Sequence, residues 1–568
     1  MAKMRFHIWK SKAALPIVFL ILVGINWIAS IYHSRADLTN EKRFTLSRPT
    51  KKILQKLDDI VQVDVFLKGQ FPSGFKKLAN STAEILDEFK EAAGNKLQYN
   101  FISPDDLMEG TNEKYGDTLS AMGLYPINLK SQLKSGEQQQ LVYPVAFVHY
   151  KDSVIPVKLY NGGPMIGYQE INNAEAMMEF EFANAIRKLT QPNKPLVAYS
   201  SGNGEPGDAR IYDLVNNVLS RDYELHTFNL NTQPLLPDTF KLLIVVKPAL
   251  AFSDEEKLKI DQFVMRGGKL LFFLDELNAE MDSLRIKNQV IAYDRGLQLN
   301  DLLFKYGVRI NPDLIMDLQS DKLPFDVNGN GQFEFLNWNY FPVFVSKSNH
   351  TINKNLGFVS GRFVNSIDTI EAEGISKTVL LSTSKNSRTI ATPALISGSE
   401  NVNAPEDAKF NKTDIPAAVL LEGKFNSYFN NRLSKAMNDS LEKYGAVYVP
   451  QCIKDNSMII VSDGDIVMNS VVKNEPIAMG MNPFTISTQY QYQFANRDFL
   501  QNCLDYLINP SGLSEARGKD YTLRLLNKTR VEKERLKWQL INIALPVMLV
   551  FFFALCYQWW RKRKYTTP

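Results

Sequence analysis

The sequence predicts an α/β protein held between two transmembrane helices, one near each end of the chain. Two observations predict these helices: the stretches 13–31 and 538–560 are uncharged and apolar, and each can cross a hydrocarbon core of about 30 Å at about 1.5 Å per residue. A third observation predicts the part between them. Short, fully apolar runs alternate there with amphipathic runs of helical spacing, which is typical of parallel strands covered by helices on both faces.

The first apolar stretch follows a basic tail of residues 1–12. A basic start before an apolar run is also typical of a secretory signal peptide. The run is longer than the apolar part of most signals, and the segment Ser34-Arg35-Ala36 matches a small-residue cleavage site poorly. We therefore expect an uncleaved anchor rather than a cleaved signal.

The second stretch ends in Trp559-Trp560 and is followed by the basic tail 561–568. Tryptophan suits the headgroup level, and an internal proline such as Pro546 is tolerated in membrane helices. The basic tail disfavours the alternative of a buried core helix. The segment 511–537 before the span is predicted to be a juxtamembrane helix or linker. Its charged part, 521–537, is predicted to be helical and could continue into the span as one rod.

Flanking charges favour both termini in the cytoplasm, because basic residues lie at both extremes of the chain. Basic residues also flank the spans on the domain side, within 35–48 and 530–537, so a simple count nearly ties. They are interleaved there with glutamates, and long loops cross a membrane largely regardless of charge. We expect a bacterial inner-membrane protein with its large domain in the periplasm.

Composition excludes several classes of function. The net charge is +4 over 568 residues, and the charged residues are spread evenly along the sequence. Without a cluster of basic residues, nucleic acid is not an expected partner. The histidines are scattered, and no CxxC motif occurs. Cys452 and Cys503 could pair in an exported domain, but their spacing leaves this open. We expect neither a metal nor a cofactor.

A first unit, 32–190, is predicted to be a small α/β domain of thioredoxin-like type. Ser47 and Pro49 signal the start of a helix. Alternating apolar residues then predict strands, helical spacing predicts helices, and Gly94 is a helix stop. The predicted strands are 61–67, 97–102, 141–148 and 154–159, and the predicted helices are 50–57, 75–92 and 173–189.

A second unit, 191–510, is predicted to contain a parallel, doubly wound sheet. Its apolar strands alternate with helices, and Ser253 with Glu256 forms a capping box before one of them. The predicted strands are 196–199, 223–230, 242–246, 270–274 and 458–461, and the predicted helices are 211–219, 257–265 and 496–507. The α/β rhythm fades over 280–450, which we expect to be a mixed or β-rich insertion.

Candidate site residues follow three of these strands at their carboxyl ends, where open α/β sheets bind their ligands. They are Gly202, Asn203, Gly204 and Glu205 after the first strand, Asp275 and Glu276 after the strand 270–274, and Asp463 and Asp465 after the last strand. Together they could form an acidic crevice for a ligand or a partner. The alternative is a set of separately solvated carboxylates at loop starts.

Several motifs fall short of a cofactor or catalytic site. Gly202, Gly204 and Gly207 match GxGxxG, but Pro206 removes a backbone donor and no acidic residue ends the next strand, so a tight turn is favoured over dinucleotide binding. Residues 326–331 resemble half of a calcium loop, but Asn337 stands where a glutamate is needed. No GxSxG elbow and no Walker A motif occur. No catalytic residue is therefore predicted.

The order of motifs along the chain resembles the gliding-motility-associated GldG family, the auxiliary component of ABC-2-type transporters. The motifs that carry the resemblance are Asp37-Leu38-Thr39, Arg43-Phe44-Thr45-Leu46-Ser47, Gly202-Asn203-Gly204-Glu205, Arg266-Gly267-Gly268-Lys269-Leu270 through Asp275, Ser462-Asp463-Gly464-Asp465, and Asn496-Arg497-Asp498-Phe499-Leu500 through Leu507. The two terminal spans match the family layout as well.

The resemblance implies a membrane partner of an ABC permease and, through it, of an ATPase, in a system that supports gliding motility and type IX secretion. It also implies a glutamine-amidotransferase-like fold for 191–510 without the catalytic Cys-His pair of that fold. We expect a non-enzymatic accessory subunit that binds periplasmic motility or secretion proteins. The alternatives are a periplasmic solute- or glycan-binding protein that uses the acidic crevice, and a hydrolase or metalloenzyme.

Overall fold

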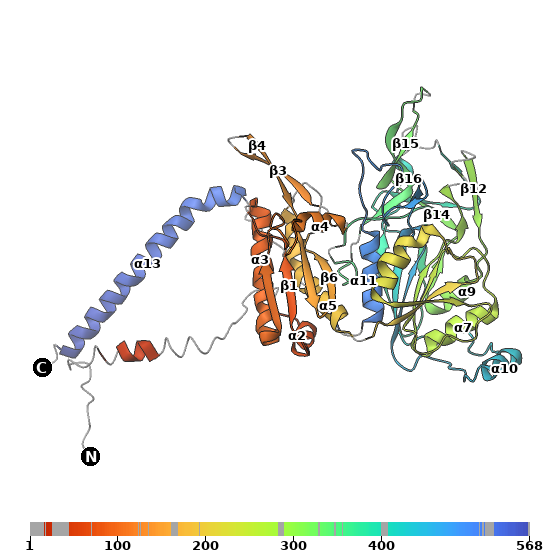
Figure 1. The fold of residues 1–568 in the computed structure, drawn as a ribbon, viewed down its shortest axis with the longest axis horizontal. Helices are drawn as coiled ribbons and strands as arrows, with labels where there is room; N and C mark the ends of the chain where they lie inside the picture. Colours follow the sequence, from red (N-terminus) through yellow and green to blue (C-terminus); the bar gives the residue numbers. More distant parts are fainter. Residues whose placement is uncertain are drawn as a thin grey trace, which may run out of the picture.

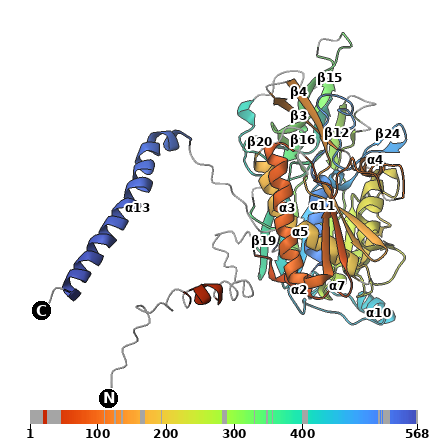
Figure 2. The same ribbon diagram turned by 60° about the vertical axis from the view of Figure 1, so that its left-hand side comes forward.

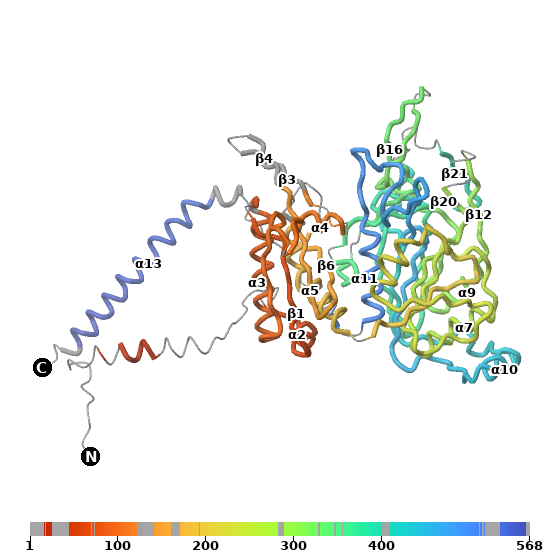
Figure 3. The backbone as a smooth tube through the Cα atoms, viewed as in Figure 1, coloured from red at the N-terminus to blue at the C-terminus, as the bar shows by residue number. Residues whose placement is uncertain are grey.

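The computed structural model describes most of the chain between its ends (Figures 1 and 3). The described residues are 16, 19–24, 45–69, 71–108, 110–122, 124, 126–133, 136–160, 168–191, 193–281, 284, 289–327, 330–345, 348–354, 356–398, 407–509, 512, 513, 516 and 528–565. They form a mixed α/β structure with many sheets, which confirms the predicted class.

The small domain contains a four-stranded sheet in the order β2-β1-β5-β6. Its strands are β1 (Val61–Val65), β2 (Leu97–Phe101), β5 (Val145–Tyr150) and β6 (Ser153–Lys158). Strand β1 runs parallel to β2 and antiparallel to β5. Alternate residues of β1 (Val61, Val63 and Val65) are buried, as the alternating pattern of the sequence predicts.

Two helices pack on this sheet, α3 (Ser73–Ala93) and α5 (Tyr168–Thr190), and α2 (Arg48–Gln55) packs against both of them. Ser47 caps α2 by accepting a hydrogen bond from the Thr50 amide at 3.4 Å, and Gly94 ends α3 with φ +63°, both as predicted. Phe89 of α3 and Phe182 of α5 pack edge to face at 6.3 Å in the core formed with β1.

One prediction in this domain is wrong in its bounds. The run 141–148 is not a single strand, because its first residues close a separate hairpin of β3 (Ile127–Leu133) and β4 (Gly136–Val142). Pro144 lies between the two strands and cannot donate to a ladder, so the strand breaks there. A short helix, α4 (Tyr115–Ala121), precedes the hairpin.

The large domain is built on a seven-stranded sheet in the order β19-β22-β23-β10-β9-β7-β8. The parallel strands are β7 (Leu196–Ser201), β8 (Glu224–Asn229), β9 (Leu242–Val246), β10 (Lys269–Phe273) and β23 (Asn456–Val461). All five residues of β9 are buried, because helices cover both faces of the sheet.

The two faces carry different cores. Leu242, Ile244 and Val246 of β9 contact α11 (Asn496–Ile508) and the π-helix η4 (Asp213–Leu219) through one buried cluster. Leu243 and Val245 point the other way, into a second cluster with α7 (Asp254–Met265) and α9 (Asn300–Tyr306). The predicted capping box of Ser253 and Glu256 starts α7.

The region predicted as one helix over 211–219 is less regular. A 3₁₀ turn, η3 (Ala209–Ile211), leads into the π-helix η4, and α6 (Ser220–Asp222) ends it. Asp213 at the start of η4 is buried and ion-paired with Arg497 of α11 at 2.5 Å. It also accepts the Met479 amide at 2.7 Å, so a distant loop and helix hold this segment.

Part of the expected insertion belongs to the central sheet. Two strands extend this sheet beyond β23: β22 (Pro416–Gly423) pairs antiparallel with β23, and β19 (Ile375–Ser382) pairs antiparallel with β22. The other strands of this region build small antiparallel sheets, whose members are β11 (Leu277–Asn278), β12 (Gln289–Asp294), β13 (Val308–Ile310), β14 (Asp313–Asp317), β15 (Ser320–Phe325), β16 (Glu334–Phe344), β17 (Val359–Ser360), β18 (Ile367–Thr369), β20 (Ser387–Ala391) and β21 (Ala394–Ser397). Trp338, fully buried, anchors the aromatic core of these sheets.

The remaining short elements lie in loops around the sheet. They are η2 (Gly94–Lys96), η6 (Asp407–Lys409), α10 (Lys435–Lys443), η7 (Asp465–Val467), β24 (Val471–Val472) and β25 (Glu475–Pro476).

The C-terminal helix α13 (Lys528–Tyr565) lies away from both domains (Figure 2). Its segment Glu534–Arg563 is long and apolar enough to cross a membrane, and no residue of its most apolar part is buried. The helix continues unbroken through the expected boundary between juxtamembrane segment and span. Of the predicted first span, residues 16 and 19–24 are helical, and the rest of 13–31 lies outside the described residues.

Candidate functional site

The strand order places four carboxyl ends side by side, those of β7, β9, β10 and β23. Strand β8 lies on the far side of β7, so the direction of the chain connections reverses between β7 and β9. Such a reversal point is where open α/β sheets bind ligands. The predicted site residues do follow these strands, but the structure divides them into three groups.

The first group is organised by Lys247, the residue after β9. Its side chain is 5% exposed, and its Nζ atom lies 2.8 Å from Asp465, 3.1 Å from Asp275 and 3.3 Å from Glu280. These carboxylates outweigh burial and raise the pKa of Lys247 above its ordinary value. Two of the predicted acids, Asp275 and Asp465, thus contact a buried lysine that is not among the predicted site residues.

The backbone around Lys247 is tightly packed. Lys247 has φ +44°, an uncommon value for a residue with a side chain. A Cβ atom added to Gly464 would lie 2.5 Å from the Cβ of Lys247, so only glycine fits beside it. The loops after β9 and β23 therefore meet in direct contact.

Asp463 is fully buried beneath this ion cluster. Its carboxylate accepts the amides of Arg362 at 2.8 Å and of Asp465 at 2.7 Å. Burial, with the nearby charges of Asp465 and Asp275, raises the pKa of Asp463 well above its usual range. Asp463 therefore holds two loops, because each of its carboxyl oxygens accepts a backbone amide.

The neighbouring acids behave differently because their contacts differ. Burial raises the pKa of Asp275 despite Lys247, and its Oδ1 atom accepts the Gly464 amide at 2.6 Å. Burial would also raise the pKa of Asp465, but Lys247 and Arg362 outweigh it and lower the value. Asp465 is therefore the charged partner of Lys247 in this cluster.

Arg295 completes the cluster on its outer side. Its Nη2 atom lies 3.1 Å from Glu280 and 4.0 Å from Asp275, and its side chain is 10% exposed. Breaking one member of such a buried network leaves an uncompensated charge. The arrangement is a closed ion network rather than an open acidic crevice.

Glu276 forms the second group on its own. It follows Asp275 directly and points elsewhere, since successive residues of an extended chain face opposite sides. Asn300 donates to its Oε1 atom at 2.7 Å, and its own amide donates to Asn365 at 2.9 Å. Burial and the nearby Asp294 raise the pKa of Glu276 to about 7.

The third group is the turn after β7. Glu205 folds back to accept the Asn203 amide at 2.8 Å and the Ser200 hydroxyl at 2.6 Å. Gly202 and Gly204 have φ values of +113° and +79°. A Cβ atom on Gly204 would lie 2.9 Å from the Cβ atom of Ala249. Close packing, rather than phosphate binding, therefore explains why a glycine stands at this position.

Asn203 joins this turn to the next loop and to α7. Its carbonyl accepts the amides of Ala249 and Leu250, and its Nδ2 atom donates to Glu256 at 3.1 Å. Three neighbouring elements at the reversal point are thus bonded to one another.

Lys247, Glu280 and Arg295 are not among the site residues that the sequence predicts. A signal for Lys247 existed, because a lysine directly after a fully apolar strand must be exposed or ion-paired at the strand end. No comparable signal marks Glu280 or Arg295. Within the part of the chain that the structure describes, no group of three or more His, Cys, Asp or Glu side chains is arranged to hold a metal ion.

The suggested pairing of Cys452 and Cys503 does not form. Cys452 belongs to the core on one face of the central sheet and Cys503 to the core on the other. The sheet lies between the two buried side chains, and no disulfide joins them. Burial raises the pKa of the Cys452 thiol to about 11, so it packs as an apolar side chain.

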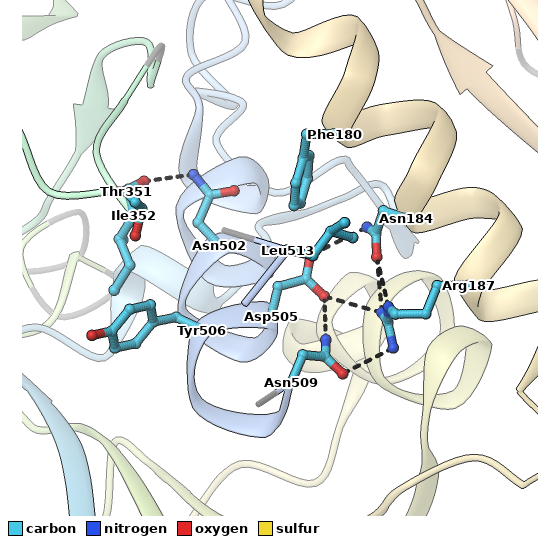
Figure 4. A pocket seen from close by; sticks show the side chains of 10 residues that line it. All are labelled: Phe180, Asn184, Arg187, Thr351, Ile352, Asn502, Asp505, Tyr506, Asn509 and Leu513. Carbon is cyan, nitrogen blue, oxygen red and sulfur yellow. Dashed lines mark hydrogen bonds and ion pairs between the residues drawn. The ribbon is translucent and has the colours of Figure 1, made fainter. Parts of the chain in front are cut away.

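A narrow cleft of about 20 Å³ lies where the two domains meet, between α5 and α11 (Figure 4). Arg187 of α5 reaches across it and donates to Asn509 at 2.8 Å, with Asp505 at 3.7 Å. Asn184 donates to Asp505 at 3.4 Å. Polar side chains thus join the small domain to the large one.

In the central α/β sheet, an internal ion network fills the position where such sheets bind ligands. The chain also has a helix long enough to span a membrane. Together these features define a membrane-associated α/β protein. Comparison with known families gives the particular group. The chain belongs to the family described as "ABC-type uncharacterized transport system", whose model matches residues 194–503, more than half of the chain. Membership makes it an accessory component associated with an ABC transporter complex.

Residues 40–149 match a domain of unknown function, which covers most of the small domain. An uncharacterised protein of Borreliella burgdorferi is 24% identical over 436 residues, which is 74% of this chain and 78% of that protein.

Solved structures show weaker likeness. The mmIFT52 N-terminal domain has a TM-score of 0.31 at 11% identity, over 55% of this chain and 97% of that one. The exo-beta-1,4-mannosidase Op5Man5 of an Opitutaceae bacterium has a TM-score of 0.20 at 11% identity, over 69% of this chain and 46% of that one. At these scores the likenesses carry no argument about fold or function.

Proposed function

We propose that this chain is a non-enzymatic accessory subunit whose two terminal spans dock on an ABC permease, and whose large domain binds a partner protein or an exported substrate. The observation that carries the non-enzymatic part is the position of Lys247. Its ion pairs with Asp275, Glu280 and Asp465 occupy the edge of the sheet where a substrate would otherwise bind. This supports a scaffold that presents surfaces rather than a reaction centre.

The finer parts of the proposal rest on sequence. Basic tails at both ends support two cytoplasmic termini and a periplasmic domain in the inner membrane. Resemblance to the GldG family supports roles in gliding motility and type IX secretion. It also supports an amidotransferase-like fold for 191–510, beside a thioredoxin-like fold for 32–190.

The alternative of a solute- or glycan-binding component is less well supported. A ligand would have to bind to Asp275 and Asp465, which are already paired with Lys247. The third acid, Glu205, is hydrogen-bonded within its own turn. A ligand there would have to displace these contacts at the cost of buried charges.

The test is affinity purification of the tagged full chain from its native membranes, with mass spectrometry of what is retained. We expect an ABC permease and an ATPase to be enriched. The matched control ends at residue 533 and so lacks the segment Glu534–Arg563, and it should lose both. A chain that purifies without other membrane subunits would overturn the proposal.

A further inference from the structure

The segments that lead to the two ends of the chain start from one place on the small domain. Leu46 on the incoming segment and Leu513 and Ala516 on the outgoing segment are buried in the same core. A Cβ atom added to Gly512 would lie 3.5 Å from Pro49 at the start of α2. The chain therefore enters and leaves the folded part side by side.

The apolar part of α13 has an exposed lateral surface, which carries two amides near its domain-side end. They are Gln539, which directly follows Trp538 at the level of the headgroups, and Asn542, which lies four residues after Trp538 and therefore deeper in the hydrocarbon. A side-chain amide in hydrocarbon requires a hydrogen-bond partner, and neighbouring membrane helices commonly provide it. Leu545 and Leu549 follow Asn542 on the same side of the helix, at spacings of three and seven residues.

The first apolar stretch carries an amide at the matching depth. Asn26, which lies outside the described residues, is five residues before Ile31, the domain-side end of the stretch 13–31. At about 1.5 Å per residue, Asn26 and Asn542 would lie about 7.5 Å and 6 Å below that end. Two spans that flank one domain must run antiparallel, so these depths coincide.

We propose that the stretch 13–31 of the same chain packs against the Asn542 side of α13 within the bilayer, with the side-chain amides of Asn26 and Asn542 hydrogen-bonded to each other. Each amide offers a donor and an acceptor, so the pair can satisfy both groups. The shared anchoring of Leu46 and Leu513 keeps the two segments together. The inference rests on the proposed function only in requiring that both stretches cross the same membrane.

The test uses the full chain in its native membranes, with Cys556→Ser to remove the exposed thiol of the span. Asn26→Cys and Asn542→Cys are combined, oxidised with copper phenanthroline, and assayed by mass spectrometry for the linked peptide in a product of monomer mass. The control replaces Asn542→Cys with Ala544→Cys, which lies about 200° around the helix. We expect about fivefold more linkage in the first pair than in the control, because only its two thiols face each other.

A second pair, Val23→Cys with Leu545→Cys, keeps the test decisive if the first variant is not recovered in membranes. It lies one turn deeper on the same two sides. Any of four results would overturn the inference: equal linkage in pair and control, no linkage in an inserted chain, a product of dimer mass, or an adduct with another protein. Co-purification of the permease from the same membranes tests the proposed function separately, since internal linkage can occur with or without it.

Discussion

The Nζ atom of Lys247 lies 2.8 Å from Oδ2 of Asp465, although the two residues are 218 positions apart in the chain. This contact joins the loop after β9 to the loop after β23 across the carboxyl edge of the central sheet. It closes the position at which related architectures bind ligands.

Replacing Lys247 by methionine should destabilise the large domain strongly. The change leaves the carboxylates of Asp275 and Asp465 buried without their cation, which costs about 3–5 kcal/mol. Thermal unfolding of the full chain in detergent should show the loss. Lys241→Met, at an exposed position just before the same strand, is the matched control and should leave the midpoint unchanged. Equal stability of the two variants would contradict the role given to Lys247.

Glu276 should make the stability depend on pH near neutrality. Its folded-state pKa of about 7 lies above its ordinary value of 4.5, so its contribution is complete below about pH 4.5 and is lost as the pH rises through 7. Glu276→Gln, which is neutral at every pH, should therefore be more stable than the native chain at pH 8, by about 3 kcal/mol, and similar at pH 4.5.

Unfolding midpoints measured from pH 4.5 to pH 8 for both proteins check this difference. The exposed Glu334→Gln serves as control and should follow the native curve. Parallel curves for the native chain and Glu276→Gln would show that this carboxyl group does not titrate in the expected range.

Gly204→Ala should destabilise the turn after β7 by about 1–3 kcal/mol. The added Cβ would lie 2.9 Å from that of Ala249, and the backbone there has φ +79°. Gly207→Ala in the same loop has nothing within 4 Å and no positive φ, so it should be tolerated. The free energies of unfolding of the two variants, measured by chemical denaturation, check this difference. An equal loss in both variants would show that replacing any glycine of this loop is destabilising, whatever its surroundings.

Arg187→Ala should loosen the contact between the two domains without unfolding either. Arg187 donates to Asn509 at 2.8 Å and lies beside Asp505, so its removal leaves part-buried polar groups across the cleft unpaired (Figure 4). Amide hydrogen exchange should increase at the C-terminal turn of α5 and in α11, while β9 and β10 stay protected. Arg309→Ala, which breaks the exposed pair with Asp368, should change neither region.

Cys452 and Cys503 should remain unreactive toward maleimide until the protein unfolds. Both thiols are buried, and burial raises the pKa of Cys452 to about 11. Intact-mass measurement should find label on neither residue in the native chain and on both after denaturation, with the same result before and after reduction. A gain of label on reduction alone would reveal a disulfide.

Much of the fold follows from residues that are close in sequence. The apolar strand 242–246, the capping box of Ser253 and Glu256, and the helix after Asn496 appear where periodicity predicts them. Local patterns cannot decide which strands pair, and for this reason β19 and β22 were expected in a separate insertion. The break at Pro144 was missed because apolar residues continue on both sides of it.

The candidate site divides in the same way. The sequence places Glu205, Asp275 and Asp463 after their strands, because strand ends are local features. Whether those acids meet, and what faces them, depends on strand order and on where long loops return. Glu276 illustrates this. It is adjacent to Asp275 in the sequence, but its side chain faces the opposite side of the chain and contacts Asn300 instead of Lys247.

By itself, the sequence determined the apolar C-terminal helix, the alternation of strands and helices, and the carboxylates at the strand ends, because each is set by neighbours within a few residues. Only the tertiary structure decided that these carboxylates are ion-paired or hydrogen-bonded within the protein rather than open to a ligand. The strand order brings Lys247 between Asp275 and Asp465, and a buried lysine is stable there only with charged partners that distant parts of the chain supply.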